Sequence, residues 1–167
     1  MLFFYNCDIP VNSSDSQIIY IESFRTNYSF DSDSIYIELK IVNYDKGRAK
    51  QLNKGAKVAK FDWLYFLHSD CVPPKNFKEI IYKSMNNKNQ ASCFKLKFNP
   101  SNFLLSLSAK ATKYNNIFCR GGDQSLLIHK NLFFLCDGYD EEYKVCEDIN
   151  LIKKIYKLGE FKIMEGY

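Results

Sequence analysis

Short apolar runs alternate with longer amphipathic stretches along the chain. Runs of four to eight residues rich in Ile, Val, Tyr and Phe are typical of strands, whereas apolar residues spaced three and four apart are typical of helices. The pattern predicts strands at Ile18–Ile21, Ile35–Val42, Trp63–Leu67, Ala91–Phe98, Ser125–Ile128 and Phe161–Met164. It predicts helices at Lys46–Lys60, Asn76–Met85, Asn102–Lys113 and Asp148–Leu158, with a helical turn at Asn131–Leu135.

This alternation of strands and helices indicates an α/β layered fold. The run Trp63–Leu67 is apolar on both faces, as expected for a strand of a mainly parallel sheet with helices on both faces. Ligands of such sheets bind beyond the carboxyl ends of the strands. The 167 residues contain neither a repeat nor a clear linker, so we expect a single domain over residues 1–167.

Composition excludes several classes of protein. Hydrophobic residues make up 46% and charged residues 25%, which is a globular rather than a disordered composition. The net charge of +4 is too small to indicate nucleic-acid binding, although it suits a phosphate-bearing ligand or an anionic membrane surface. Neither a membrane-spanning run nor a signal peptide is recognisable. We therefore expect a cytoplasmic protein, and attachment to the inner face of the membrane stays open.

Cysteine usage points to reduced thiols rather than to a metal or disulfide framework. The six cysteines form no C-x-x-C pair, and the chain has only two histidines. A structural zinc site therefore has little support, and we expect mostly buried, reduced thiols.

Polar residues follow the apolar strand Trp63–Leu67 directly. His68 and Asp70 are separated by one residue, so both lie on the same side of the chain if the extended pattern continues. A carboxylate at the carboxyl edge of a sheet can hold a divalent cation, which neutralises a diphosphate. The alternative is that Asp70 begins an ordinary turn before Pro73 and Pro74.

The predicted helix Lys46–Lys60 begins with Gly47 and Arg48. Free backbone N–H groups and the helix dipole favour anions at a helix start, so Arg48 is placed to grip a phosphate. The alternative is that the basic residues of this helix only form a solvated face. A further candidate is Arg120–Gln124, where paired glycines let the backbone approach a ligand closely; an ordinary tight turn accounts for it equally well.

An acidic pair, Glu147 and Asp148, begins the last predicted helix. Adjacent helical residues point about 100° apart, so the two side chains are not expected to face one ligand. Asp148 is expected on the inward side with Ile155, as a candidate base that deprotonates a hydroxyl, whereas Glu147 points towards Asn150 and Lys154. The alternative is an acidic pair favoured only by the helix dipole.

Taken in this order, the four segments resemble the family-two glycosyltransferases. Gly47–Gly55 is similar to the family's G-R-A-x-Q-x-N-x-G helix, and Phe66–Asp70 is similar to the F-L-H-A-D-T form of its D-x-D segment. Gly122–Gln124 matches a G-D-Q motif, and Glu147–Ile149 matches an E-D-I segment. The resemblance covers residues 35–165.

The resemblance implies a GT-A fold, a Rossmann-like sheet that binds a UDP- or GDP-sugar and an acceptor with a free hydroxyl. It implies that Asp148 is the catalytic base of an inverting displacement. Asp70 would bind Mg²⁺ or Mn²⁺, with His68 as a second candidate ligand. The residues implied in substrate binding are Glu22, Arg48, Asn53, Ser69, Gly122, Asp123, Gln124 and Glu147. A homo-oligomer stays open.

Residues 1–34 depart from the family pattern and are interpreted as a divergent, shortened part of the nucleotide-binding region. Glu22–Arg25 stands where relatives carry an acidic, glycine-rich turn. One alternative is therefore a degenerate, non-catalytic GT-A-fold protein that binds a sugar, a nucleotide or a protein partner. A nucleotidyltransferase is a weaker alternative, because the chain lacks a glycine-rich, basic loop near its N-terminus.

Overall fold

The computed structural model describes nine segments of the chain: residues 2–6, 16–25, 36–44, 47–68, 71–86, 90–120, 124–143, 147–158 and 161–166. In the first three of these segments it describes the backbone only. The strands are β1 (Leu2–Asn6), β2 (Ser16–Arg25), β3 (Tyr36–Tyr44), β4 (Trp63–His68), β5 (Ala91–Cys93), β6 (Leu126–His129) and β7 (Phe161–Ile163). The helices are α1 (Arg48–Val58), α2 (Phe77–Met85), α3 (Phe103–Ala111), α4 (Lys130–Leu135) and α5 (Glu147–Lys157), with a 3₁₀ helix η1 (Ile117–Cys119).

The described strands form one sheet in the order β3-β2-β1-β4-β6-β5-β7. Strands β1 and β4 pair in parallel, as do β5 and β7, whereas the other four pairings are antiparallel. The prediction of a mainly parallel sheet is therefore wrong for the strand pairings. Although β1, β3, β4, β5 and β7 all run in one direction, β2 and β6 lie between them in the other.

Short connections explain part of this difference. Parallel neighbours need a crossover of about a dozen residues or more, usually with a helix. Residues 7–15 join β1 to β2 and residues 26–35 join β2 to β3, and both connections fall short of that length. The three strands are therefore paired antiparallel. A strand that is apolar on both faces, such as β4, indicates that both faces of the sheet are covered. It does not indicate whether the neighbouring strands run parallel or antiparallel to it.

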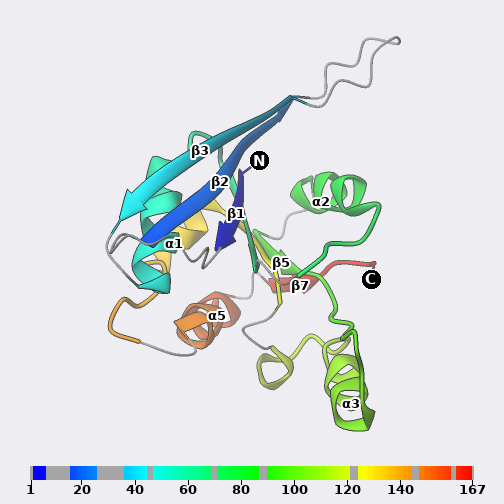
Figure 1. Ribbon diagram of the computed structural model, residues 1–167. Coiled ribbons are helices and arrows are strands. Elements are labelled where there is room, and N and C mark those ends of the chain that lie inside the picture. Colours follow the sequence, from blue (N-terminus) through cyan, green and yellow to red (C-terminus); the bar gives the residue numbers. More distant parts are fainter. Residues whose placement is uncertain are drawn as a thin grey trace.

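The side chains of β4 divide the core into two layers. Leu64 and Phe66 point into one apolar cluster, whereas Tyr65 and Leu67 point into the other, as the alternation of a strand requires. All four are buried. The helices accordingly cover both faces, as predicted: α1, α4 and α5 pack on the first cluster and α2 on the second. Figure 1 shows α1 and α2 on opposite sides of the sheet.

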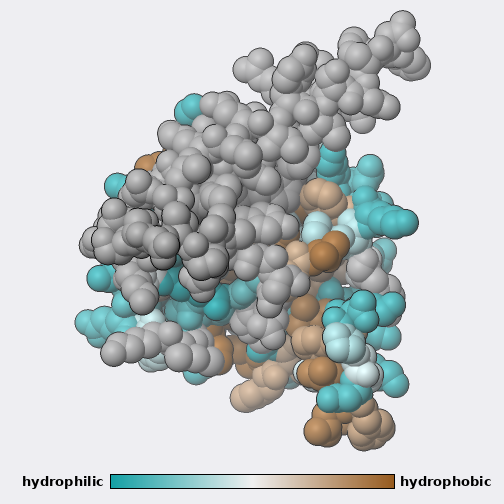
Figure 2. Space-filling view, viewed as in Figure 1, coloured by the Kyte–Doolittle hydropathy of each residue, from teal (hydrophilic) through white to brown (hydrophobic). Residues whose placement is uncertain are grey.

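Helix α3 contributes no buried side chain, although its sequence is apolar. It begins at Asn102, whose side-chain oxygen accepts a hydrogen bond from Leu105 N at 2.8 Å. Its exposed apolar residues are Phe103, Leu104 and Leu107. In Figure 1 α3 extends away from the sheet, and Figure 2 shows apolar side chains on the surface of that region. Among the described helices, none is long and apolar enough to cross a membrane.

The predicted elements agree closely with the described ones. Every predicted helix is present within two residues at each end. The strand predicted at Trp63–Leu67 is one residue longer, the one at Ser125–Ile128 is shifted by one residue, and the one at Phe161–Met164 is one residue shorter. The strand predicted at Ala91–Phe98 ends at Cys93, because β6 and β7 provide pairing partners no further. The prediction omits β1 and η1.

Candidate functional site

Three elements bring charged side chains together at the carboxyl end of β4. Arg48 is the first residue of α1, His68 is the last residue of β4, and Glu147 and Asp148 are the first two residues of α5. The site therefore lies where the α/β pattern predicts a ligand, beyond the carboxyl ends of the parallel strands β1 and β4.

Arg48 is the centre of this cluster. Its Nε lies 2.9 Å from Glu147 Oε1, and its Nη2 lies 3.6 Å from Asp148 Oδ2. The same Nη2 lies 3.0 Å from Nδ1 and 2.7 Å from Nε2 of His68. One guanidinium thus holds the starts of α1 and α5 against the end of β4, and it fixes the position of both carboxylates.

The two acids differ in burial in the opposite sense to the prediction. The Glu147 side chain is 4% exposed and the Asp148 side chain 17%. Glu147 is aligned with the buried Leu151 and Ile155, four and eight residues further along α5. The prediction that the two acidic side chains do not face one common group is therefore wrong, because both lie against Arg48. Both acids contact the long Arg48 side chain, through two different nitrogens of its guanidinium.

Glu147 has an unusual environment for a buried carboxylate. Within the described residues its Oε1 accepts no directed hydrogen bond, and the positive charge of the guanidinium 2.9 Å away stabilises it. Removing a carboxylate from water is costly unless a charge of opposite sign compensates it. Arg48 is therefore required by the buried acid, whatever else it binds.

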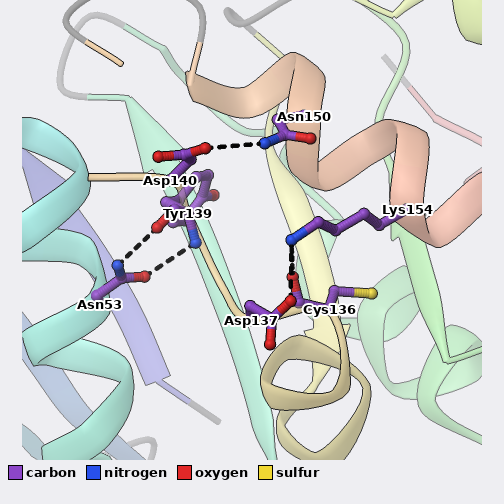
Figure 3. Close-up of polar contacts among 7 residues, drawn as sticks. All are labelled: Asn53, Cys136, Asp137, Tyr139, Asp140, Asn150 and Lys154. Atoms are coloured by element: carbon purple, nitrogen blue, oxygen red, sulfur yellow. Dashed lines mark hydrogen bonds and ion pairs between the residues drawn. The ribbon is translucent and has the colours of Figure 1, made fainter. Parts of the chain in front are cut away.

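Asn53 holds the segment that precedes α5. Its Nδ2 donates to Tyr139 O at 2.8 Å and to Glu141 Oε1 at 2.9 Å, and its Oδ1 accepts from Tyr139 N at 3.0 Å. The amide is buried and all of these contacts lie within the chain. Figure 3 shows the two contacts with Tyr139. The structure places Asn53 as a clamp on residues 136–141, and its predicted contact with the nucleotide stays a prediction.

Helix α5 holds the same segment from the other side. Asn150 Nδ2 donates to Asp140 Oδ2 at 3.1 Å, and Lys154 Nζ donates to Cys136 O at 2.9 Å and pairs with Asp137 Oδ2 at 3.1 Å. Figure 3 shows the segment between α1 and α5, with contacts to both. The turn needs Gly138, which has a φ of 66°.

Tyr139 is buried beneath this turn, next to the charged cluster. Burial is the main reason that its pKa is raised well above the ordinary value; Asp148 raises the pKa further, Arg48 lowers it and Glu147 raises it. The phenol is therefore neutral at any physiological pH. Tyr139 also packs edge-on against Phe66 of β4, with ring centroids 5.2 Å apart.

Two hollows meet at Asp148. A cavity of about 20 Å³, room for roughly one water-sized group, is lined by Asp148, Tyr139, Ser125 and Gln124, among other residues. A larger pocket of about 350 Å³ between α5 and η1 also has Asp148 in its wall. The buried hydroxyl of Ser125 has no hydrogen-bond partner in the described part of the chain. Asp148 is thus the acid of the cluster that a small molecule can reach.

Gln124 stands beside the smaller cavity, but its amide is used by the protein. Its Nε2 donates to Phe94 O at 3.0 Å and lies 3.5 Å from Cys93 Sγ. This contact ties the start of β6 to the end of β5. Its predicted contact with the acceptor stays a prediction.

The other predicted site residues are less well described. Ser69, Asp70, Gly122 and Asp123 lie outside the described residues. Glu22 belongs to β2, where its backbone is opposite Leu2 and Glu38, and its side chain is not described.

The described residues do not by themselves form a cation site. No three His, Cys, Asp or Glu side chains lie together as metal ligands in the segments listed above. Both ring nitrogens of His68 face the Arg48 guanidinium, a cation, which is unsuitable for a metal ligand. Mg²⁺ or Mn²⁺ bound by Asp70 stays a prediction, and the contacts of His68 with Arg48 count against His68 as a second ligand.

The sequence did not predict Tyr139 or Ser125 as residues of the site. The Asp137-Gly138 pair that comes before Tyr139 marks a turn, but nothing in the sequence shows that Tyr139 packs beneath it. Ser125 has no sequence signal either, because only the tertiary structure brings it near α5.

A sequence model of the family described as Glycosyl transferase family 2 matches residues 13–139. The matched range covers most of the chain, from β2 to Tyr139, and includes Arg48, His68 and Asn53. Glu147 and Asp148 follow it. No curated protein matches the chain.

Proposed function

The chain belongs to glycosyl transferase family 2, and from that membership we propose that it moves a sugar from a nucleotide-diphosphate sugar to an acceptor hydroxyl, with inversion at the anomeric carbon. The observation that supports the proposal best is the position of Asp148. Asp148 lines both a small cavity and a larger pocket, and its carboxylate pairs with Arg48.

The chemistry assigned to Asp148 is that of a general base. One of its oxygens takes the proton of the acceptor hydroxyl while the hydroxyl oxygen forms a bond to the anomeric carbon. The bond between that carbon and the diphosphate oxygen breaks, and the nucleoside diphosphate leaves with the electron pair. Attack opposite to the leaving group inverts the anomeric configuration.

The donor is proposed to be a UDP- or GDP-sugar at the carboxyl edge of β1 and β4. Arg48, Ser69 and Asp70 belong to this edge in the sequence interpretation, and a divalent cation held by Asp70 would supply charge for the departing diphosphate. No step is derived through that cation, because the described residues do not complete its site. We also propose that the protein is cytoplasmic and that it can attach to the inner face of the membrane.

A second candidate is a family member that binds a nucleotide or a sugar without transferring it. A specific observation favours it: two groups expected to bind the donor, Arg48 and Asn53, are engaged within the chain. The cluster of Arg48, Glu147 and Asp148 also carries more negative than positive charge, which does not favour a diphosphate.

Replacing Asp148 tests its role as the general base. We expect Asp148→Asn to lower the transfer rate by about 10²- to 10⁴-fold, the usual contribution of a general base, while donor affinity stays within about twofold. The measurement pairs product formation with calorimetric titration of the donor. Asp62→Asn is the matched control, because Asp62 is exposed and belongs to neither hollow.

Unchanged transfer by the Asp148→Asn protein would exclude Asp148 as the base. Binding of a donor without transfer by the wild-type protein, across a broad set of acceptors, would instead favour the non-catalytic candidate.

A further inference from the structure

The pocket of about 350 Å³ beside Asp148 is large enough for a ring or a short chain. It is formed by α5 on one side and by η1 on the other. Its lining residues are Ile117, Phe118, Arg120, Asp148, Ile149, Ile152 and Lys153. Because Asp148 is one of them, a molecule that places a hydroxyl at this carboxylate extends into this pocket.

Most of the pocket wall is apolar and reaches water. Phe118 is 93% exposed and Ile149 is 41% exposed, while Ile117 and Ile152 are half-buried. Apolar side chains gathered around a hollow are a signature of a binding surface, whereas single exposed apolar residues are not. In Figure 2 apolar residues are also visible over the region that α3 and η1 occupy in Figure 1.

The wall has three polar residues, Arg120, Asp148 and Lys153, against four apolar ones. The Arg120 guanidinium is used within the chain: its Nη1 donates to Cys93 Sγ at 3.0 Å, and its Nη2 donates to Thr112 O at 2.8 Å. These hydrogen bonds position η1, and they occupy donors of Arg120 that a ligand would otherwise use. A sugar ring placed among the isoleucines would lose water from its hydroxyls without replacement, which is unfavourable.

We propose that this pocket binds an apolar group, an alkyl chain or an aromatic ring, that the acceptor carries next to its reacting hydroxyl. The inference rests on the proposed function, because it takes Asp148 as the base. The acceptor is then amphipathic: its hydroxyl lies at Asp148 and its apolar part lies against Phe118, Ile149 and Ile152. Such a group is carried by a dissolved glycoside or by a lipid-anchored acceptor.

Two matched glucosides test the pocket directly. The full chain is titrated with n-octyl glucoside, below the concentration at which it forms micelles, and with methyl glucoside. We expect at least about tenfold tighter binding of the octyl compound, because two buried methylenes already account for that ratio. Equal affinity of the two compounds would overturn the proposal.

Variants show whether the preference comes from this pocket. Phe118→Ser and Ile149→Ser are each expected to reduce the octyl preference at least about threefold. Both side chains are exposed, so we expect both variants to fold. Leu135→Ser is the matched control, since Leu135 is exposed on α4 and does not line the pocket. A preference that persists in both pocket variants would reflect non-specific binding of detergent and would overturn the proposal.

A vesicle experiment separates the two sources of the apolar group. Phosphatidylcholine vesicles with and without a dialkyl glucoside are sedimented with the protein. Binding that requires the glycolipid and Phe118 supports a lipid-anchored acceptor, whereas binding of octyl glucoside alone supports a dissolved one. The donor titration is independent: if no nucleotide sugar binds but the octyl preference holds, the proposed function fails and the pocket stands.

Discussion

Arg48 is the residue on which the charged cluster depends. It is the cation that faces both the buried Glu147 and the accessible Asp148, and it lies on a different helix from either acid. A buried carboxylate without its cation is much less stable than either the pair or a neutral side chain of the same shape. The same contact that positions the proposed base is therefore also a contribution to the fold.

We expect Arg48→Met to lower the free energy of unfolding by about 1–3 kcal/mol, less than for a fully buried pair because the Arg48 side chain is 37% exposed. Urea denaturation measures the change. The double variant Arg48→Met with Glu147→Gln should recover most of the loss, since the amide carries no charge. Lys57→Met, an exposed change on the same helix, is the control. Equal stability of wild type and Arg48→Met would contradict the role of the ion pair.

A buried thiol provides a test of pH dependence. Burial raises the pKa of Cys93 from 9.0 to about 11, against the opposing effect of the Arg120 charge and hydrogen bond. The native state therefore keeps this proton at pH values where the unfolded chain loses it. The stability that results is fully present below pH 9 and is lost as the pH rises towards 11.

We expect the stability advantage of the wild type over Cys93→Ala to shrink by about 2 kcal/mol between pH 8 and pH 11. Denaturation of both proteins at several pH values gives the difference, and the comparison cancels the titration of other groups. A difference that stays constant over this range would show that Cys93 is accessible to water.

At the scale of elements, the turn at residues 136–141 joins the two halves of the site. Asn53 of α1 and Lys154 of α5 hold it from opposite sides (Figure 3), and Tyr139 packs beneath it on Phe66 of β4. The start of α5, and hence Asp148, follows this turn by a few residues. The geometry of the turn therefore contributes to the position of the proposed base.

Gly138 is the residue of this turn that tolerates change least. A Cβ there would lie 2.6 Å from Asn53 Oδ1 and 3.0 Å from the Phe133 ring, and the φ of 66° already disfavours a side chain. We expect Gly138→Ala to destabilise the protein by about 2–3 kcal/mol, measured by thermal or urea unfolding.

The neighbouring Asp137, also at positive φ, provides the control. Asp137→Asn keeps a residue type that accepts this conformation and loses only an exposed ion pair, so its effect should stay within about 0.5 kcal/mol. If Gly138→Ala were as stable as this control, the close approach to Asn53 would be disproved.

The helices could be predicted because their apolar residues recur at regular helical spacing. Which side of each helix packs on the sheet could not be predicted. In α5, apolar residues stand at Leu151, Ile152 and Ile155, so the period alone fits a stripe through Glu147 or one nearer Asp148. In the structure the buried side of α5 runs through Glu147, together with Leu151 and Ile155. Similarly, the sequence marks Asn53 as a polar residue on an otherwise apolar helix face, but its partners are 86 and 88 residues away.

At the scale of the whole molecule, the predicted α/β class is confirmed, and family membership agrees with the GT-A fold that the resemblance implied. The strand directions were less accessible to prediction. They depend on the length of each connection, and the hydrophobic pattern does not report which strands are neighbours.

The predicted site is partly assembled by the fold. Arg48, His68, Glu147 and Asp148 come from three motifs that the sequence could only order along the chain, and the structure brings them within hydrogen-bond or ion-pair distance. The role of Asp70 as a metal ligand is a prediction of sequence alone.

Calorimetric titration of the full chain with UDP- and GDP-sugars, with and without Mn²⁺, tests the central claim most directly. A glycosyltransferase that uses a nucleotide-sugar donor should show saturable binding of at least one of these compounds, and Asp148→Asn should keep it. Absence of binding by every donor, in both conditions, would contradict the account.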